Sequence, residues 1–125
     1  MELYLGGFSQ GKLQYVLAGK GSATTIESLT GIPQDTLSVP VIFNRFHVWF
    51  YREMEQGRNP EEQMEAFLEH CPEVIIISDE VGNGIVPELP LEREYRERLG
   101  RYLCRVAKRA VRVERVVCGI GQRIK

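Results

Sequence analysis

The run V-I-I-I at residues 74–77 constrains the fold of this chain most, because it is apolar at every position. A continuously apolar run of this length is typical of a β-strand covered on both faces, as in a parallel sheet flanked by helices. A carboxylate pair, Asp79 and Glu80, comes soon after it, and residues 81–87 read V-G-N-G-I-V-P. Glycines let the backbone approach a ligand closely, and ligands of open α/β sheets bind outside the carboxyl ends of the strands. The segment 79–87 therefore predicts a ligand site at the end of a buried strand.

Predicted strands and helices alternate along the whole chain. We expect strands at residues 2–5, 24–26, 41–43, 74–77 and 113–117, the last closed by residues 119–121, and helices at residues 12–18, 45–56, 60–70 and 91–110. Residues 28–40 hold glycine and proline among few large apolar groups, which is typical of a connection. The alternation predicts an α/β fold with a mainly parallel sheet and helices on its faces. At 125 residues, the chain is expected to form one domain over residues 1–125.

Three aromatic side chains, Phe46, Trp49 and Phe50, recur at helical spacing within residues 45–56. We expect this stripe in the core, and an exposed remainder of it could form a subunit interface. The next helix has a clear start signal, because Asn59 suits the capping position and Pro60 suits the first helical position.

The charge balance argues against a nucleic-acid partner. Sixteen Lys and Arg residues face 17 Asp and Glu residues, and the net charge of −1 lacks the strong basic field of such binders. No window approaches the roughly 18 apolar residues of a membrane span, and the N-terminus lacks the pattern of a signal peptide. We therefore expect a cytoplasmic protein without a membrane partner. Three widely spaced cysteines predict buried thiols rather than a disulfide framework or a zinc site.

Residues 6–12 resemble a phosphate-binding loop. They match the first seven positions of G-x-x-x-x-G-K-[ST] and lie between a predicted strand and a predicted helix. Backbone N–H groups of such a loop can cradle phosphates, and Lys12 would neutralise their outer oxygens. Leu13 breaks the pattern, because the hydroxyl normally found there coordinates Mg²⁺. The alternative is a glycine-rich turn of purely structural meaning. The candidate nucleotide-binding residues are Gly6, Gly7, Phe8, Ser9, Gln10, Gly11 and Lys12.

Three segments resemble the bifunctional adenosylcobinamide kinase/adenosylcobinamide-phosphate guanylyltransferases of cobalamin biosynthesis. The loop 6–12 is similar to the family's G-G-x-x-S-G-K-S, and residues 79–87 are similar to its N-E-V-G-x-G-I-V-P, with Asp79 in place of asparagine. The ending G-I-G-Q-R-I-K at residues 119–125 continues the similarity. The resemblance implies a P-loop NTPase-like (RecA-like) domain, GTP or ATP as nucleotide, a corrinoid as second ligand, and a homo-oligomer, with a trimer as first guess.

The middle of the chain departs from this family where its chemistry is concentrated. Residues 28–40 lack the histidine that the family guanylylates, so the resemblance implies loss of the guanylyltransferase half. Asn44 lies where the family has a metal-linked carboxylate, and His47 lies where it has a threonine. Together with Leu13, these changes imply weakened support for Mg²⁺. We assign no protein residues to a metal site.

Two function classes follow. In the first, the chain is a reduced transferase that binds GTP or ATP through residues 6–12 and phosphorylates a cobinamide-like alcohol, with Lys12 and Glu80 as catalytic residues. Glu80 would hold Mg²⁺ or position the hydroxyl, unless Asp79 and Glu80 only cap the following loop. In the second, it is a non-catalytic relative that binds a nucleotide or corrinoid, or acts through its oligomer surfaces. On either view, His47 is interpreted as a half-buried packing residue.

Overall fold

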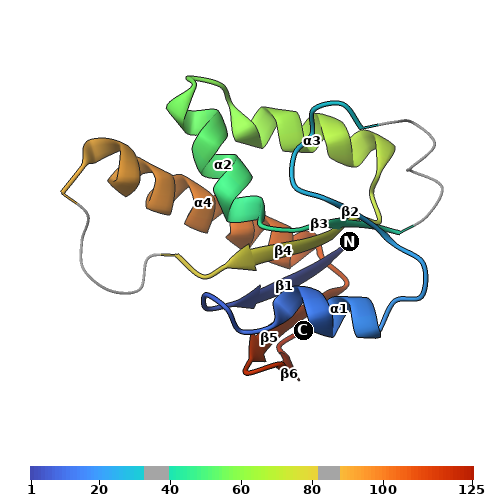
Figure 1. Ribbon diagram of the computed structural model, residues 1–125. Coiled ribbons are helices and arrows are strands. Elements are labelled where there is room, and N and C mark those ends of the chain that lie inside the picture. The colour runs from blue at the N-terminus through green and yellow to red at the C-terminus, as the bar shows by residue number, and fades with distance from the viewer. Residues whose placement is uncertain (33–39, 82–87) are drawn as a thin grey trace.

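A six-stranded sheet forms the centre of the computed structural model, which describes residues 1–32, 40–81 and 88–125 (Figure 1). The strands are β1 (Glu2–Gly6), β2 (Thr24–Ile26), β3 (Val41–Phe43), β4 (Ile75–Asp79), β5 (Arg112–Val117) and β6 (Ile120–Arg123). They lie in the order β2-β3-β4-β1-β5-β6. Every neighbouring pair is parallel except β5 and β6, which are antiparallel. The prediction of an α/β fold with a mainly parallel sheet is therefore confirmed.

The helices of the described residues cover both faces of this sheet. They are α1 (Lys12–Ala18), α2 (Phe46–Glu55), α3 (Pro60–His70) and α4 (Pro90–Arg109). Because side chains alternate along a strand, Leu3 and Ile76 face the larger core under α2, α3 and α4, whereas Tyr4 and Ile77 face a smaller core under α1. Figure 1 shows α1 set apart from the other three helices. None of the helices in the described residues has the length and apolar character needed to cross a membrane.

The predicted start of α3 is confirmed in detail. The Asn59 side chain accepts a hydrogen bond from the backbone N–H of Glu62 at 3.0 Å, and Pro60 occupies the first helical turn. A cap of this kind satisfies a backbone donor that the helix itself leaves unpaired. The ends of α3 at His70 and of α4 at Arg109 place basic side chains in the last turn, as the helix dipole favours.

The aromatic stripe of α2 is buried in the core. Phe46 and Phe50 are 0% exposed and Trp49 is 3% exposed. Phe46 lies 5.2 Å from the Phe43 ring and 5.9 Å from the Tyr102 ring, centroid to centroid. The expectation that part of this stripe serves a subunit interface is therefore wrong, because the chain itself covers all three rings.

The carboxyl-terminal segment differs from the sequence-based expectation. Residues 119–121 were expected to close the last strand, but the chain turns at Cys118 and Gly119 and returns as β6. Both turn residues have positive φ, 50° and 76°, which is what a tight type I′ hairpin requires. The expectation of buried thiols is also wrong in part, because Cys71 is buried whereas Cys104 and Cys118 are exposed.

Candidate functional site

The loop after β1 and the carboxyl end of β4 lie side by side. In the parallel register between these strands, Gly6 pairs with Asp79, and the backbone N–H of Glu80 donates to the Gly6 carbonyl at 2.9 Å. The expectation that the loop 6–12 and the segment after β4 share one edge of the sheet is therefore confirmed for residues 79–81. Residues 82–87 of that segment lie outside the described residues.

Lys12 is the buried cation of this edge, with 8% of it exposed. Its ammonium group donates to the Gly7 carbonyl at 2.7 Å and to Asp79 Oδ1 at 2.7 Å, and it lies 3.5 Å from the Gly6 carbonyl. Gly6 is required here, because a Cβ at this position would come within 2.5 Å of the Val116 carbonyl oxygen. The same Cβ would lie 3.3 Å from Cδ of Lys12, so glycine at this position also leaves room for the lysine side chain at the floor of the loop.

Two hydrogen bonds hold the loop 6–12 against the turn between β5 and β6. The Gln10 side-chain oxygen accepts from the backbone N–H of Cys118 at 2.8 Å, and the Gln10 carbonyl accepts from the N–H of Gly119 at 2.8 Å. Gly11 has a φ of 78°, a left-handed conformation that glycine adopts without steric cost, and it caps α1. The loop is therefore a supported structure rather than a free segment.

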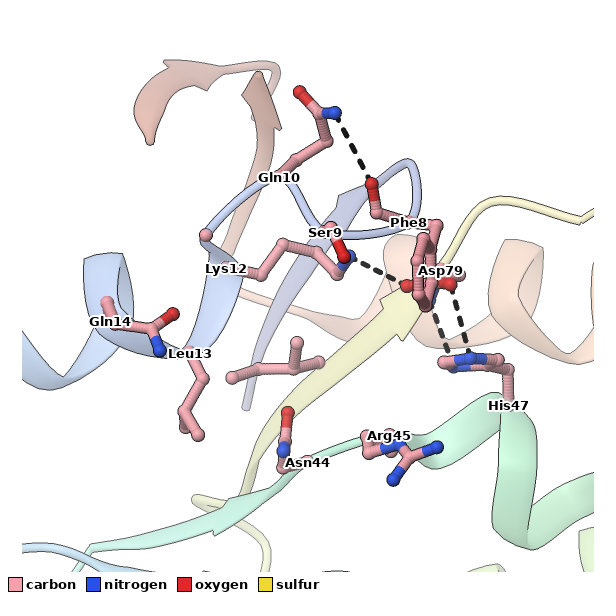
Figure 2. Close-up of a pocket in the computed structure, with 12 residues that line it drawn as sticks. Phe8, Ser9, Gln10, Lys12, Leu13, Gln14, Asn44, Arg45, His47 and Asp79 are labelled. Carbon is pink, nitrogen blue, oxygen red and sulfur yellow. Dashed lines mark hydrogen bonds and ion pairs between the residues drawn. The ribbon is translucent and has the colours of Figure 1, made fainter. Parts of the chain in front are cut away.

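Asp79 links Lys12 to His47, as Figure 2 shows. Its Oδ2 lies 3.3 Å from Nε2 of His47, and its backbone N–H donates to Nδ1 of the same ring at 3.1 Å. Nδ1 is thus an acceptor, which places the single proton of a neutral ring on Nε2, facing the carboxylate. Burial lowers the pKa of His47, and Lys12 and Arg45 add to that effect against the opposing charge of Asp79. The neutral ring is the favoured form.

A cavity of about 200 Å³ opens beside these groups. It is lined by residues of the loop and the start of α1, of α2 with its approach, and of the end of β4: Phe8, Ser9, Gln10, Gly11, Lys12, Leu13, Gln14, Asn44, Arg45, His47, Ile77 and Asp79. Among these described residues Asp79 is the one carboxylate. Phe8 is 83% exposed at the rim.

The donor set of this cavity does not fit a protein-held Mg²⁺. Leu13 offers no oxygen, and the Asn44 amide donates to the Glu27 carboxylate at 3.0 Å. Asp79 already accepts from Lys12. Within residues 1–32, 40–81 and 88–125, no group of three or more His, Cys, Asp and Glu side chains is placed to hold a metal ion. We therefore derive no chemical step through a metal.

Glu80 lies in a second, larger cavity of about 450 Å³ between α2 and α4. Its carboxylate pairs with Arg115 at 2.9 Å, whereas the neighbouring Asp79 contacts Lys12.

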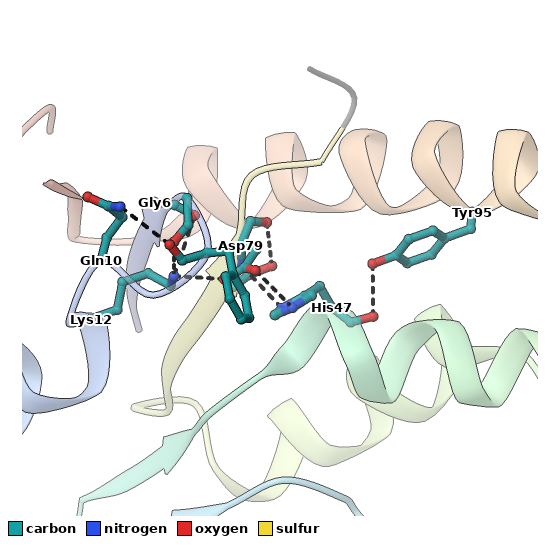
Figure 3. Close-up of polar contacts among 9 residues, drawn as sticks. Gly6, Gln10, Lys12, His47, Asp79 and Tyr95 are labelled. Atoms are coloured by element: carbon teal, nitrogen blue, oxygen red, sulfur yellow. Dashed lines mark hydrogen bonds and ion pairs between the residues drawn. The ribbon is translucent and has the colours of Figure 1, made fainter. Parts of the chain in front are cut away.

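His47 lines both cavities, so the two cavities share a wall. Figure 3 shows that the Tyr95 hydroxyl, donating to the His47 carbonyl at 3.1 Å, supports this wall from α4. Sequence reasoning thus named Glu80 but did not find the contact of Asp79 and His47.

A family model described as cobinamide kinase / cobinamide phosphate guanyltransferase matches residues 18–124, most of the chain. The chain belongs to this family. Its P-loop-like α/β fold, expected from the resemblance, is thereby confirmed. The matched region begins after the loop 6–12, so the assignment of that loop rests on its own pattern and geometry.

Two curated relatives of the chain share one name. The bifunctional adenosylcobalamin biosynthesis protein CobU of Escherichia coli (strain K12) is 44% identical over 79 residues, which cover 62% of this chain and 44% of the relative. The protein of the same name from Salmonella typhimurium (strain LT2) is 43% identical over 79 residues, with the same shares. The aligned part thus spans less than half the length of these relatives.

Proposed function

We propose that this family member binds GTP or ATP through residues 6–12 and acts in cobalamin biosynthesis as a kinase-type transferase. The observation that carries the proposal is the placement of Lys12, buried at the floor of a loop that follows the central strand β1. Such a lysine neutralises phosphoryl oxygens, while backbone N–H groups of the loop donate to the others. The proposed nucleotide-binding residues are those of the whole loop, from Gly6 to Lys12.

The acceptor in this proposal is a cobinamide-like alcohol, positioned by Glu80 from the second cavity. The alcohol oxygen would form a bond to the terminal phosphorus while the bond to the bridging oxygen breaks, releasing the nucleoside diphosphate. Glu80 would accept the hydroxyl proton, provided that the carboxylate is released from Arg115. The shared wall at His47 supports this arrangement, because it brings the Glu80 cavity next to the Lys12 cavity.

The same sites also favour a second candidate, a non-catalytic relative. Lys12 is paired with Asp79 and Glu80 is paired with Arg115, so neither catalytic group is free in the described structure. A protein of this kind would bind a nucleotide or corrinoid, or act through its oligomer surfaces. A homo-oligomer, first of all a trimer, stays a prediction from the family resemblance, and the mass of the intact chain in solution tests it.

Calorimetric titration with GTP, ATP, pyrophosphate and a corrinoid, each with and without Mg²⁺, tests the proposal. We expect nucleotide and pyrophosphate binding that depends only weakly on Mg²⁺, because Leu13 and Asn44 offer the ion no anionic ligand. Transfer of the terminal phosphoryl group from the nucleotide to a corrinoid alcohol would distinguish the transferase from the binding protein. Absence of any binding tighter than about 1 mM would remove the phosphate-loop assignment.

We also propose that the guanylyltransferase half is lost. The residues 28–40 hold no histidine to carry the nucleotide, and His47 uses both ring nitrogens in contacts with Asp79. After incubation with GTP and Mg²⁺, the intact mass of the protein should therefore be unchanged. An added mass of one GMP, mapped to His47 or His70, would show that the nucleophile has moved.

A further inference from the structure

The side chain of Asp79 occupies the place beside Lys12 that an anionic ligand would take. Lys12 has three ammonium hydrogens, and three acceptors lie around it: the Gly7 carbonyl and Asp79 Oδ1 at 2.7 Å and the Gly6 carbonyl at 3.5 Å. Two of these acceptors belong to the backbone of the loop itself. Asp79 is the one that carries charge, and it neutralises the cation before any ligand arrives.

Asp79 is held in this position from three directions. Its residue is paired in register with Gly6, its backbone N–H donates to Nδ1 of His47, and its second carboxylate oxygen faces Nε2 of His47 at 3.3 Å (Figure 3). The ion pair is also well shielded, since 8% of the lysine side chain and 19% of the aspartate side chain are exposed. A shielded, anchored pair is weakened less by solvent and salt than a surface pair.

We propose that Asp79 is an internal competitor of phosphate for Lys12 and so determines how strongly the loop 6–12 binds anions. A phosphate that reaches Lys12 must displace this carboxylate or share the cation with it at close range. Either event opposes binding, by loss of an ion pair or by repulsion between like charges. His47 acts as a positioning residue, because it keeps the carboxylate on the lysine. The inference rests on the proposed phosphate binding but concerns a residue outside the loop.

The test is the Asp79→Asn variant, titrated with pyrophosphate by calorimetry. Removing the charge while keeping the shape should raise the affinity about five- to tenfold, because the lysine then loses a hydrogen bond to an uncharged amide oxygen rather than an ion pair when the ligand binds. The matched control is Glu2→Gln. Glu2 is also 19% exposed and pairs with a lysine, Lys20, at 2.8 Å, but it lies at the opposite end of β1, and its variant should leave the affinity unchanged.

A Lys12→Ala/Asp79→Asn double variant separates local competition from a general change of charge. If Asp79 competes for Lys12, the gain from Asp79→Asn should be smaller in the Lys12→Ala background, where only repulsion between like charges is left to relieve. A His47→Phe variant gives a second route: it keeps Asp79 but removes the ring nitrogens, so the affinity should rise by less than in Asp79→Asn. The His47→Phe variant still tests the inference if Asp79→Asn does not fold.

Each result has one meaning. If wild type binds pyrophosphate and neither Asp79→Asn nor His47→Phe binds it more tightly, the competitor inference is overturned while the proposed function stands. A gain that is as large without Lys12 as with it overturns the inference as well. If neither wild type nor any variant binds pyrophosphate, the proposed function and the competitor inference are both wrong. If Asp79→Asn binds and wild type does not, the inference holds and phosphate binding by the natural chain is lost.

Discussion

Replacing Lys12 by alanine should weaken the binding of ATP, GTP or pyrophosphate by about 1.5 to 3 kcal/mol, the range for hydrogen bonds to charged groups. The variant removes the cation at the floor of the loop and leaves the Asp79 carboxylate without its partner at 2.7 Å. An anionic ligand would then meet the Asp79 carboxylate without the lysine that neutralises it, and Arg45 would be the one cation left among the described residues that line the cavity. Calorimetric titration of the variant against wild type measures the effect.

The matched control is Lys20→Ala, which removes a lysine from the residues just after α1 and likewise breaks a single ion pair, that with Glu2. Its affinity for pyrophosphate should equal that of wild type. Thermal unfolding of both variants should show that each remains folded at the titration temperature. If wild type binds and Lys12→Ala binds equally well, Lys12 does not hold the phosphate. If wild type has no affinity for ATP, GTP or pyrophosphate at millimolar concentration and Lys12→Ala changes nothing, the loop 6–12 is only a structural turn.

Replacing Phe46 by alanine should lower the free energy of unfolding by about 3 to 5 kcal/mol. The ring is 0% exposed and packs against the rings of Phe43, Trp49, Phe50 and Tyr102, with centroids 5.2 to 6.0 Å apart. Its removal leaves a cavity where α2, α4 and β3 meet. Because a domain is typically stable by only about 5 to 15 kcal/mol, this loss is a large part of the total.

Urea denaturation of Phe46→Ala measures this loss, with Phe8→Ala as the control. Phe8 is the same residue type, but it is 83% exposed, so its removal should change the free energy of unfolding by less than about 0.5 kcal/mol. Equal effects of the two substitutions would show that Phe46 is not part of a packed core.

Much of the fold could be predicted from local signals. The apolar run at 74–77 gave the central strand β4, shifted along the chain by one residue at its start and two at its end. Asn59 and Pro60 fixed the start of α3, because capping depends on neighbouring residues alone. The hairpin to β6 was missed for the opposite reason. Its turn uses Cys118 with a φ of 50°, and cysteine is not a residue that signals a left-handed turn.

The meeting of the loop 6–12 with the end of β4 was predicted, but the contacts between them were not. Parallel strands put their carboxyl ends at one edge, so the sequence could bring the loop 6–12 near Asp79 and Glu80. It could not decide which carboxylate meets Lys12, because neighbouring strand residues point to opposite faces. Ile75 and Ile77 pack in the core under α1, and Asp79 shares their parity. Knowing on which face of the sheet α1 packs would have shown that Asp79, and not Glu80, meets Lys12. That face is a property of the tertiary structure.

The hydrogen bonds between Gln10 and the turn at Cys118 and Gly119 bear on the entropy of ligand binding. A loop that must order itself around a ligand loses conformational freedom at that moment, and this loss reduces the affinity. Here the turn between β5 and β6 fixes the middle of the loop when the sheet forms, so most of that ordering belongs to the folding of the chain. The last hairpin, remote in sequence from the loop, thus preorganises the loop for the anion that we propose binds there.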